Sequence, residues 1–308
     1  MAESFTPSSC SSAATCADAS AARRLRLSAP DYDLAATLAS GQVFRWHPRG
    51  DSWVGVVHGR WVKLQQRSGA IAARTALPQS DWRWLTDYLQ VEASLENMLA
   101  TFPNDGPMQT AVTACHGLRL LRQEPWECLA SFILSSTKQI VQIQQIIALL
   151  CTRFGSPVAV PRGEAPAFAF PAAEHLATAT EGELRACKMG FRAPYLLATA
   201  RQIATGECDL KTIRALPLED ARSELMKLPG VGGKIADCVL LFAYGYSAAF
   251  PLDVWVTKAL RQLYFPRRRV QPARLRQFAA THFGPNAGYA QQYLFHYMRT
   301  RRQKNPSP

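Results

Sequence analysis

A glycine-rich segment between two predicted helices constrains this chain more than any other feature. Residues 228–238 read LPGVGGKIADC, and three of the four positions from 230 to 233 are glycine. Apolar residues at helical spacing precede the segment, and a more apolar helix is predicted over 235–244. Glycine reaches positive φ cheaply and allows a backbone to approach another molecule closely. The pattern therefore predicts a helix-hairpin-helix whose backbone N–H groups bind a phosphate chain without reading its sequence.

Two residues add chemistry to a segment that would otherwise only bind phosphate. Lys234 stands at the positive end of the second predicted helix beside apolar residues, and both surroundings favour its neutral amine. A neutral lysine is a nucleophile, whereas a charged one is a phosphate ligand, and the spacing alone leaves both interpretations open. Asp253 follows nineteen residues later at a predicted helix start. There it can cap the helix and also stabilise positive charge that develops on a sugar.

Four motifs accompany these residues in a fixed order. They are LASGQVFRW at 38–46, GFRA at 190–193, VGGKIADC at 231–238 and GPNAGYAQ at 284–291. Together they resemble the 8-oxoguanine DNA glycosylase family of the helix-hairpin-helix DNA glycosylases, over residues 34–299. The resemblance implies a base excision repair enzyme that removes 8-oxoguanine from duplex DNA. It implies attack of Lys234 on the sugar C1′ with support from Asp253, followed by β-elimination, the AP lyase step.

The resemblance also implies four residues that bind the damaged base. Gly41 would offer its backbone carbonyl to the N7–H that distinguishes 8-oxoguanine from guanine, whose N7 is an acceptor. Cys238 and Phe295 would sandwich the flipped purine, and Gln291 would bond its Watson–Crick edge. Without the resemblance, these residues are an ordinary loop glycine, core side chains and an amide.

Five further residues are implied to contact DNA outside the base pocket. Phe191 would fill the gap left by the flipped base, and Arg192 would bond the widowed partner. Gly230 and Gly232 would bind the backbone at the hairpin, and Thr137 would lie near the opposite strand.

The chain departs from the family pattern at three places. Thr137-Lys138-Gln139 replaces a run of three asparagines, Gln142 replaces an arginine, and Trp255 replaces a histidine. The first two departures put recognition of the opposite base in question, and the third does so for one phosphate contact.

The predicted fold class is α+β, with an antiparallel-sheet domain followed by a mainly helical helix-hairpin-helix glycosylase domain. Residues 1–24 are rich in Ser, Ala and Thr and are expected to form a disordered tail. The expected boundaries are 25–115 for the first domain, 116–300 for the helical domain and 301–308 for a basic tail.

Periodicity and turn residues predict the elements within these domains. The strands are predicted at 44–47, 53–57 and 60–65, with His58-Gly59 connecting the last two. The helices are predicted at 80–89, 95–101, 126–134, 136–154, 181–187, 193–205, 255–264, 272–281 and 287–299.

Charge and cysteine usage bound the partners and cofactors. A formal net charge of +12 and a pI near 9.6 favour a polyanion, and we expect damaged double-stranded DNA rather than a membrane surface. The sequence contains no apolar run of about eighteen residues, so no transmembrane helix is predicted. Eight cysteines include no C-x-x-C pair, which argues against structural zinc and favours reduced thiols. None follows Cys238, so the four-cysteine iron–sulfur site of some superfamily members is excluded.

We therefore expect an intracellular, DNA-associated monomer, in the nucleoid of a prokaryote or the nucleus of a eukaryote. No metal or organic cofactor is expected, and a monovalent cation at the hairpin is left open. Two alternatives remain. One is a glycosylase for alkylated or mismatched bases, which would need only an aspartate and water. The other is a noncatalytic helix-hairpin-helix protein that binds DNA. The presence of both Lys234 and Asp253 argues against each of them.

Overall fold

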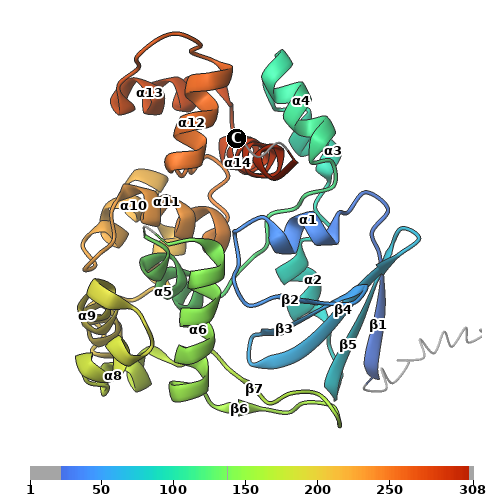
Figure 1. The fold of residues 1–308 in the computed structure, drawn as a ribbon, viewed down its shortest axis with the longest axis vertical. Coiled ribbons are helices and arrows are strands. Elements are labelled where there is room, and N and C mark those ends of the chain that lie inside the picture. The colour runs from blue at the N-terminus through green and yellow to red at the C-terminus, as the bar shows by residue number, and fades with distance from the viewer. Residues whose placement is uncertain (1–21, 137, 305–308) are drawn as a thin grey trace, which may run out of the picture.

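The structure is a computed structural model that describes residues 22–136 and 138–304. Its first part is a five-stranded antiparallel sheet in the order β1-β5-β4-β3-β2 (Figure 1). The strands are β1 Ala22–Ser28, β2 His47–Arg49, β3 Ser52–Val57, β4 Arg60–Arg67 and β5 Ala70–Gln79.

Two tight turns connect the three central strands. His58-Gly59 joins β3 to β4 as predicted, and Ser68-Gly69 joins β4 to β5. Their φ angles are 47° and 72° in the first turn and 45° and 71° in the second. Positive φ at both central residues is what a two-residue hairpin turn requires, because its twist then matches that of the strands.

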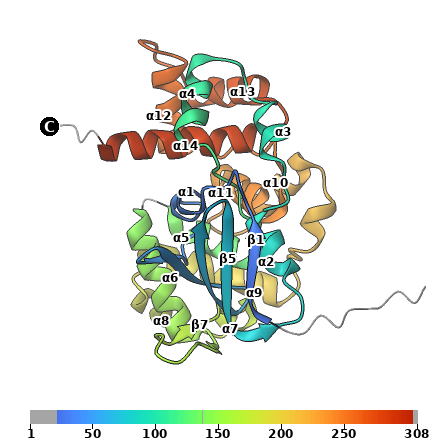
Figure 2. The same cartoon turned by 90° about the vertical axis from the view of Figure 1, so that its right-hand side faces the viewer.

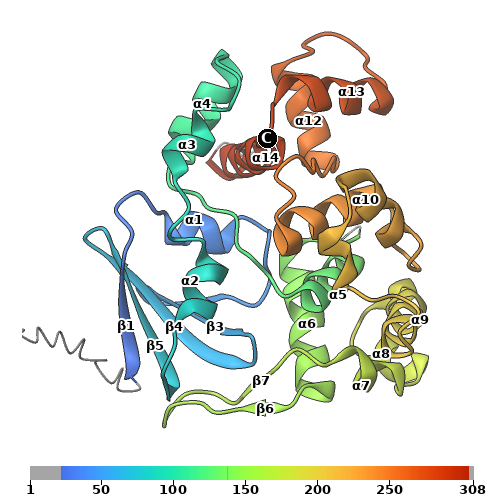
Figure 3. The same cartoon turned by 180° about the vertical axis from the view of Figure 1, so that it is seen from behind.

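Two helices cover one face of the sheet (Figure 3). They are α1 Leu34–Ala39 and α2 Arg83–Leu89. Leu38 of α1 and Leu85 of α2 share a core with Leu64 and Ile71 of the sheet. This layer gives the first part of the chain its own hydrophobic centre.

Helices make up the rest of the chain around a second and larger core. They are α3 Leu95–Leu99, α4 Gly106–Ala114, α5 Pro125–Ser135, α6 Ile140–Phe154, α7 Ala173–Ala177, α8 Glu181–Ala186, α9 Ala193–Ala204, α10 Leu218–Met226, α11 Gly233–Val239, α12 Val254–Leu263, α13 Pro272–His282 and α14 Ala287–Lys304. Shorter pieces are the two-residue strands β6 Pro157–Val158 and β7 Ala167–Phe168, 3₁₀ turns at Gly190–Arg192 and Thr212–Ala215, and a π turn at Leu240–Tyr244. The predicted α+β class is confirmed.

The helix α4 belongs by packing to the helical core, although it comes early in the sequence. Met108 and Ala111 are buried in that core, and α4 lies beside α14 (Figure 2). The Asp105 carboxylate, which caps α4, accepts a hydrogen bond from the Tyr264 hydroxyl at 3.1 Å and pairs with His282 at 2.8 Å. The boundary at 115/116 stays a prediction.

Several predicted limits of elements were wrong. The tail was expected to extend to residue 24, but β1 begins at Ala22 because its backbone pairs with the end of β5. The helix expected from residue 136 begins at Ile140, where the Gln142 side chain accepts the Gln139 N–H at 3.1 Å. The last helix continues to Lys304 instead of yielding to a tail at 301, because that stretch consists of good helix formers.

Other elements were misplaced or missed. The strand predicted at 44–47 begins only at His47. Strands β1 and β5 were not predicted, nor were α1, α4 and α7. Helices α1 and α7 are short, and β1 pairs with a strand that lies far away in the sequence.

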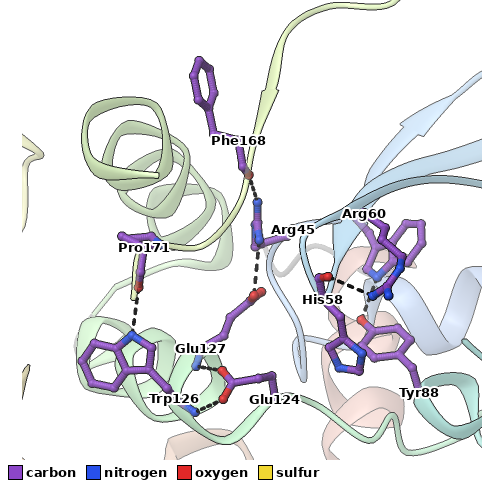
Figure 4. A network of polar contacts seen from close by, with 10 residues as sticks. Arg45, His58, Arg60, Tyr88, Glu124, Trp126, Glu127, Phe168 and Pro171 are labelled. Atoms are coloured by element: carbon purple, nitrogen blue, oxygen red, sulfur yellow. Dashed lines mark hydrogen bonds and ion pairs between the residues drawn. The ribbon is translucent and has the colours of Figure 1, made fainter. Parts of the chain in front are cut away.

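A buried ion pair joins the sheet to the helical part (Figure 4). Arg45, just before β2, donates to Glu127 of α5 at 3.2 Å and also to the Phe168 carbonyl of β7. The two charged side chains are only 9% and 19% exposed. Burial raises the pKa of Glu127, although the charge of Arg45 opposes the change. Glu124 caps the same helix and fixes its first turn by accepting the Glu127 N–H at 2.6 Å.

We predict that Glu127→Gln lowers the free energy of unfolding by about 3 kcal/mol, because it leaves a buried guanidinium without its counter-charge. Urea unfolding would measure the change. The control is Asp51→Asn, which breaks the exposed Arg67–Asp51 pair of 3.0 Å and should cost much less, because water screens exposed ion pairs. The double variant Arg45→Met/Glu127→Leu should recover most of the loss. Equal effects of Glu127→Gln and Asp51→Asn would contradict the assignment.

Candidate active site

The predicted helix-hairpin-helix is present, formed by α10, α11 and the turn between them. Gly230 has φ of +77°, and a Cβ there would lie 2.8 Å from the Cβ of Tyr195. The turn is held by the Thr199 hydroxyl, which donates to the Pro229 carbonyl at 3.1 Å. Gly232 is exposed at the start of α11, with no atom within 4 Å of the position of a Cβ. The backbone of the hairpin is therefore open to an approaching phosphate chain.

A cavity of about 650 Å³ lies beside the start of α11. Its walls come from the loop after α1, from α5, from the beginning of α6, from α11, from the beginning of α12 and from α14. It brings together six of the residues predicted for the site, namely Gly41, Lys234, Cys238, Asp253, Gln291 and Phe295.

The amine of Lys234 lies in apolar surroundings within this cavity. Its Nζ is 5.3 Å from the centroid of the Phe132 ring, and it donates to the Ser135 hydroxyl at 3.4 Å. Both neighbours belong to α5, the helix that packs against α11. The amine thus faces a space large enough for a ligand and has one long hydrogen bond holding it.

Asp253 serves as the N-cap of α12. Its carboxylate accepts the Val256 N–H at 2.7 Å, so one oxygen has a structural role, as the sequence indicated. Burial raises the pKa of Asp253, while the Val256 N–H and the charge of Lys234 oppose that rise. A carboxylate that is partly desolvated interacts strongly with positive charge in the cavity, because little water screens it.

Cys238 lies four residues after Lys234 and forms part of the same wall. Burial raises the pKa of its thiol to about 12. The thiol is therefore protonated at neutral pH and behaves as a small apolar group. Because the thiolate is the nucleophilic form, Cys238 does not compete with the lysine as a nucleophile.

Gly41 sits in a turn that side-chain hydrogen bonds hold rigidly. It has φ of +81°. Its neighbour Gln42 is fully buried and donates to the carbonyls of Thr37 at 3.0 Å and Arg119 at 2.8 Å. Gln42 also accepts the Leu121 N–H at 2.8 Å. The backbone of residue 41 is consequently fixed against the cavity.

The last helix contributes a row of side chains spaced four residues apart. Gln291, Phe295 and Arg299 all line the cavity. Gln291 is 3% exposed, and its amide oxygen has no hydrogen-bond partner among the described residues. The position of a Cβ on Gly41 would be 3.3 Å from the Phe295 ring. The helix thus brings an aromatic face and a buried amide to the fixed turn.

The other predicted residues lie outside this cavity. Phe191 is 58% exposed in the 3₁₀ turn Gly190–Arg192. The guanidinium carbon of Arg192 lies 4.2 Å from the Phe191 ring centroid, and Arg192 is 2% exposed. In an ordinary surface pair, the arginine would be exposed and the aromatic ring would be buried. Gly230 and Gly232 form the hairpin turn, and Thr137 lies outside the described residues.

The sequence analysis did not select several residues that line the cavity. They are Phe132, Ser135, Lys138, Gln292 and Arg299. Arg299 carried a usable signal, because it continues the four-residue spacing of Gln291 and Phe295. The contribution of α5 had no such signal, because it depends on how that helix packs against α11.

The described part of the chain contains neither a metal-binding cluster nor a membrane-spanning helix. Among residues 22–136 and 138–304, no three His, Cys, Asp or Glu side chains cluster in a way that could hold a metal ion. None of the helices formed by these residues is long and apolar enough to span a membrane.

Comparison with known proteins agrees with this architecture. Residues 24–129 match the family described as 8-oxoguanine DNA glycosylase, N-terminal domain. Residues 130–284 match the HhH-GPD superfamily of base excision DNA repair proteins. These two matches define the class as a helix-hairpin-helix base excision protein.

Individual relatives narrow the class further. The chain is 30% identical to the N-glycosylase/DNA lyase OGG1 of Arabidopsis thaliana, over 88% of this chain and 78% of that protein. It is 29% identical to a probable N-glycosylase/DNA lyase of Methanothermobacter thermautotrophicus, over 89% and 96% of the two. The Clostridium acetobutylicum 8-oxoguanine glycosylase/lyase, solved with DNA containing cytosine opposite 8-oxoguanine, superposes with a TM-score of 0.83. It is 31% identical, and the match covers 88% of this chain and 93% of that one. The chain belongs to the family of 8-oxoguanine N-glycosylase/DNA lyases.

We predict that Gly41→Ala destabilises the protein more than Gly59→Ala does. Both glycines have positive φ, 81° and 72°, so each substitution carries about 1 kcal/mol of backbone strain. At Gly59 nothing lies within 4 Å of the new Cβ, whereas at Gly41 the Cβ would be 2.8 Å from Ile140 and 3.0 Å from Arg299. The excess should be about 1 kcal/mol in urea unfolding. Equal losses would show that the turn is not crowded.

Proposed function

We propose that the cavity receives an 8-oxoguanine base flipped out of duplex DNA and that Lys234 attacks the sugar to release it. The observation that carries the proposal is the convergence of a nucleophilic amine, a carboxylate and the base-binding residues on one cavity. The match to 8-oxoguanine N-glycosylase/DNA lyases along most of the chain supports the same reaction.

The first step is a substitution at C1′. The amine of Lys234, after giving up a proton, forms a bond to C1′ as the C1′–N9 bond breaks, and the base leaves with the electron pair and takes up a proton. Positive charge develops on the sugar during this step, and the carboxylate of Asp253 stabilises it. Loss of a proton from the attached amine and opening of the sugar ring then give a Schiff base.

The Schiff base permits strand cleavage. It acidifies the proton at C2′, and removal of that proton expels the 3′ phosphate with the C3′–O electron pair. This β-elimination is the lyase activity. Both steps use side chains of this protein, and neither involves a metal ion or an organic cofactor.

Selection of the base is assigned to the cavity walls. The Gly41 carbonyl accepts the N7–H of the oxidised base, and Gln291 bonds the Watson–Crick edge. Cys238, as a neutral thiol, and the ring of Phe295 stack on the two faces of the purine. Guanine, with an acceptor at N7, would place two acceptors against each other at Gly41 and is rejected.

The contacts with DNA lie around the cavity. The exposed ring of Phe191 fills the space that the flipped base leaves. When the ring moves away from Arg192, this arginine becomes accessible to the partner base. Gly230 and Gly232 bind the phosphate backbone. The protein acts as a monomer inside the cell, on damaged double-stranded DNA.

Lys234→Gln should abolish the covalent complex that borohydride traps on duplex containing 8-oxoguanine, while binding to that duplex remains. The glutamine side chain cannot form a Schiff base. Lys138→Gln is the matched control, because Lys138 lines the same cavity and should keep wild-type trapping. If trapping persists in Lys234→Gln and disappears in Lys138→Gln, the nucleophile is Lys138 and the proposed assignment is wrong.

Asp253→Asn should slow single-turnover base release about a hundredfold, because it removes the charge that stabilises the sugar. Asparagine caps a helix as well as aspartate does, so the free energy of unfolding should change by less than about 0.5 kcal/mol. Asp253→Ala removes the cap as well and should cost about 1 kcal/mol. If Asp253→Asn releases the base at the wild-type rate, the residue serves only as a cap.

A further inference from the structure

We propose that Arg299 is a specificity-determining residue that donates a hydrogen bond to the C8 carbonyl of 8-oxoguanine. The inference rests on the proposed function and extends it to a residue beyond those assigned above. Arg299 lies on α14 at the wall of the cavity. Its Nη2 donates to the Ala39 carbonyl at 3.1 Å. Its Nη1 is buried and has no hydrogen-bond partner among the described residues.

The spacing on α14 places Arg299 at the correct end of the base. Gln291, Phe295 and Arg299 follow one another at four-residue steps, so they share one face and span about 12 Å. The guanidinium carbon of Arg299 is 5.9 Å from the Phe295 ring centroid. A purine stacked on Phe295 with its Watson–Crick edge toward Gln291 turns its imidazole edge toward Arg299. The oxidised carbon C8 lies on that edge.

The turn at Gly41 is a second, independent indication that the imidazole edge of the purine lies near Arg299. A Cβ on Gly41 would be 3.0 Å from Nη1 of Arg299, so the guanidinium lies directly beside this residue. In 8-oxoguanine the N7–H donor and the C8 carbonyl acceptor are on adjacent ring atoms. An acceptor on Gly41 next to a donor on Arg299 matches that pair. Guanine has an acceptor at N7 and only a C–H at C8, so it satisfies neither contact.

The burial of Nη1 explains why the contact would be strong. A charged donor without a partner is costly in a desolvated place, and burial lowers the pKa of Arg299 accordingly. The Phe295 ring lies 3.3 Å from the same Cβ position on Gly41. A base that stacks on Phe295 brings its C8 carbonyl toward Nη1. The bond then formed is charge-assisted.

The competing explanation is that Arg299 only supports the turn through Ala39. The test is single-turnover excision by Arg299→Met, which keeps an unbranched chain of similar length and removes both donors. Arg301→Met is the matched control, because Arg301 is exposed on the same helix, with its guanidinium carbon 6.0 Å from the Tyr297 ring. The substrates are duplexes containing 8-oxoguanine, 8-thioguanine or a preformed abasic site. The base 8-thioguanine keeps the N7–H and has sulfur, a weak acceptor, in place of the C8 oxygen.

Arg299→Met should slow excision of 8-oxoguanine about ten- to a hundredfold, the range for a hydrogen bond to a charged group. It should slow excision of 8-thioguanine much less, so that the preference for oxygen over sulfur collapses. Incision at the abasic site, which has no base to recognise, should stay within about twofold of wild type. Arg301→Met should leave all three rates unchanged. Arg299→Lys, which keeps one charged donor group, should fall between Arg299→Met and wild type on 8-oxoguanine.

Three outcomes would overturn the inference. Equal losses on the oxygen and sulfur bases would show that Arg299 acts only by holding the turn. Rates for Arg299→Met equal to those for Arg301→Met would show that it has no role in excision. Parallel loss of abasic-site incision would show damage to the fold. Failure of the proposed function is seen separately, because the wild-type protein would then not excise 8-oxoguanine at all.

Discussion

The buried amide of Gln42 is the constraint on which the cavity depends. It is fully enclosed, so each of its polar atoms needs a partner, and it finds them on both sides of the cavity-forming turn. Its nitrogen donates to Thr37 in α1 and to Arg119 in the segment leading to α5, and its oxygen accepts from Leu121. The same residue's backbone carbonyl accepts from the Gln123 side chain at 2.7 Å. These bonds tie a loop of the sheet layer to the helices, and Gly41 is thereby held at the edge of a space whose other walls come from the helical core.

Burial shifts the protonation of two side chains that line that space. The walls contributed by Phe132 and Cys238 are apolar, and burial raises the pKa of the Cys238 thiol to about 12. Burial acts in the same direction on Asp253, whose carboxylate is held by one backbone N–H and by the charge of Lys234. A carboxylate that lines a poorly solvated cavity stabilises positive charge on a sugar more than it would in water. The capping role of Asp253 contributes as well, because it fixes the direction in which the carboxylate points.

Short residue patterns that carry chemistry could be predicted from the sequence, whereas the pairing of strands that lie far apart could not. The hairpin glycines, Lys234, Asp253 and the spacing of Gln291 and Phe295 are short patterns with a direct physical meaning. The structure brings the side chains of Lys234, Asp253, Gln291 and Phe295 to one cavity. The strand β1 could not be predicted in the same way, because it is stabilised by pairing with β5, some fifty residues later. The Ser68-Gly69 turn was a signal for β5 that matched His58-Gly59 and was overlooked. The start of α6 was misjudged because the Gln142 side chain accepts the Gln139 N–H at the beginning of the helix. Burial of Arg192 and the free nitrogen of Arg299 depend on three-dimensional packing alone.

The residues that line the cavity come from parts of the chain that lie far apart in sequence. The amine and the carboxylate come from the hairpin and the helix start that follows it, while the proposed contacts to the base come from the turn after α1, from α14 and, through Cys238, from α11. The position of α14 therefore matters for selection of the base more than for the covalent chemistry. That helix packs against α4, whose capping residue Asp105 also pairs with His282 at the end of α13 at 2.8 Å. Beside this pair, Asn286 donates to the Thr101 hydroxyl at 3.1 Å. Because α4 precedes the hairpin by more than a hundred residues, the order of the chain allows recognition and catalysis to be tuned by substitutions in separate elements.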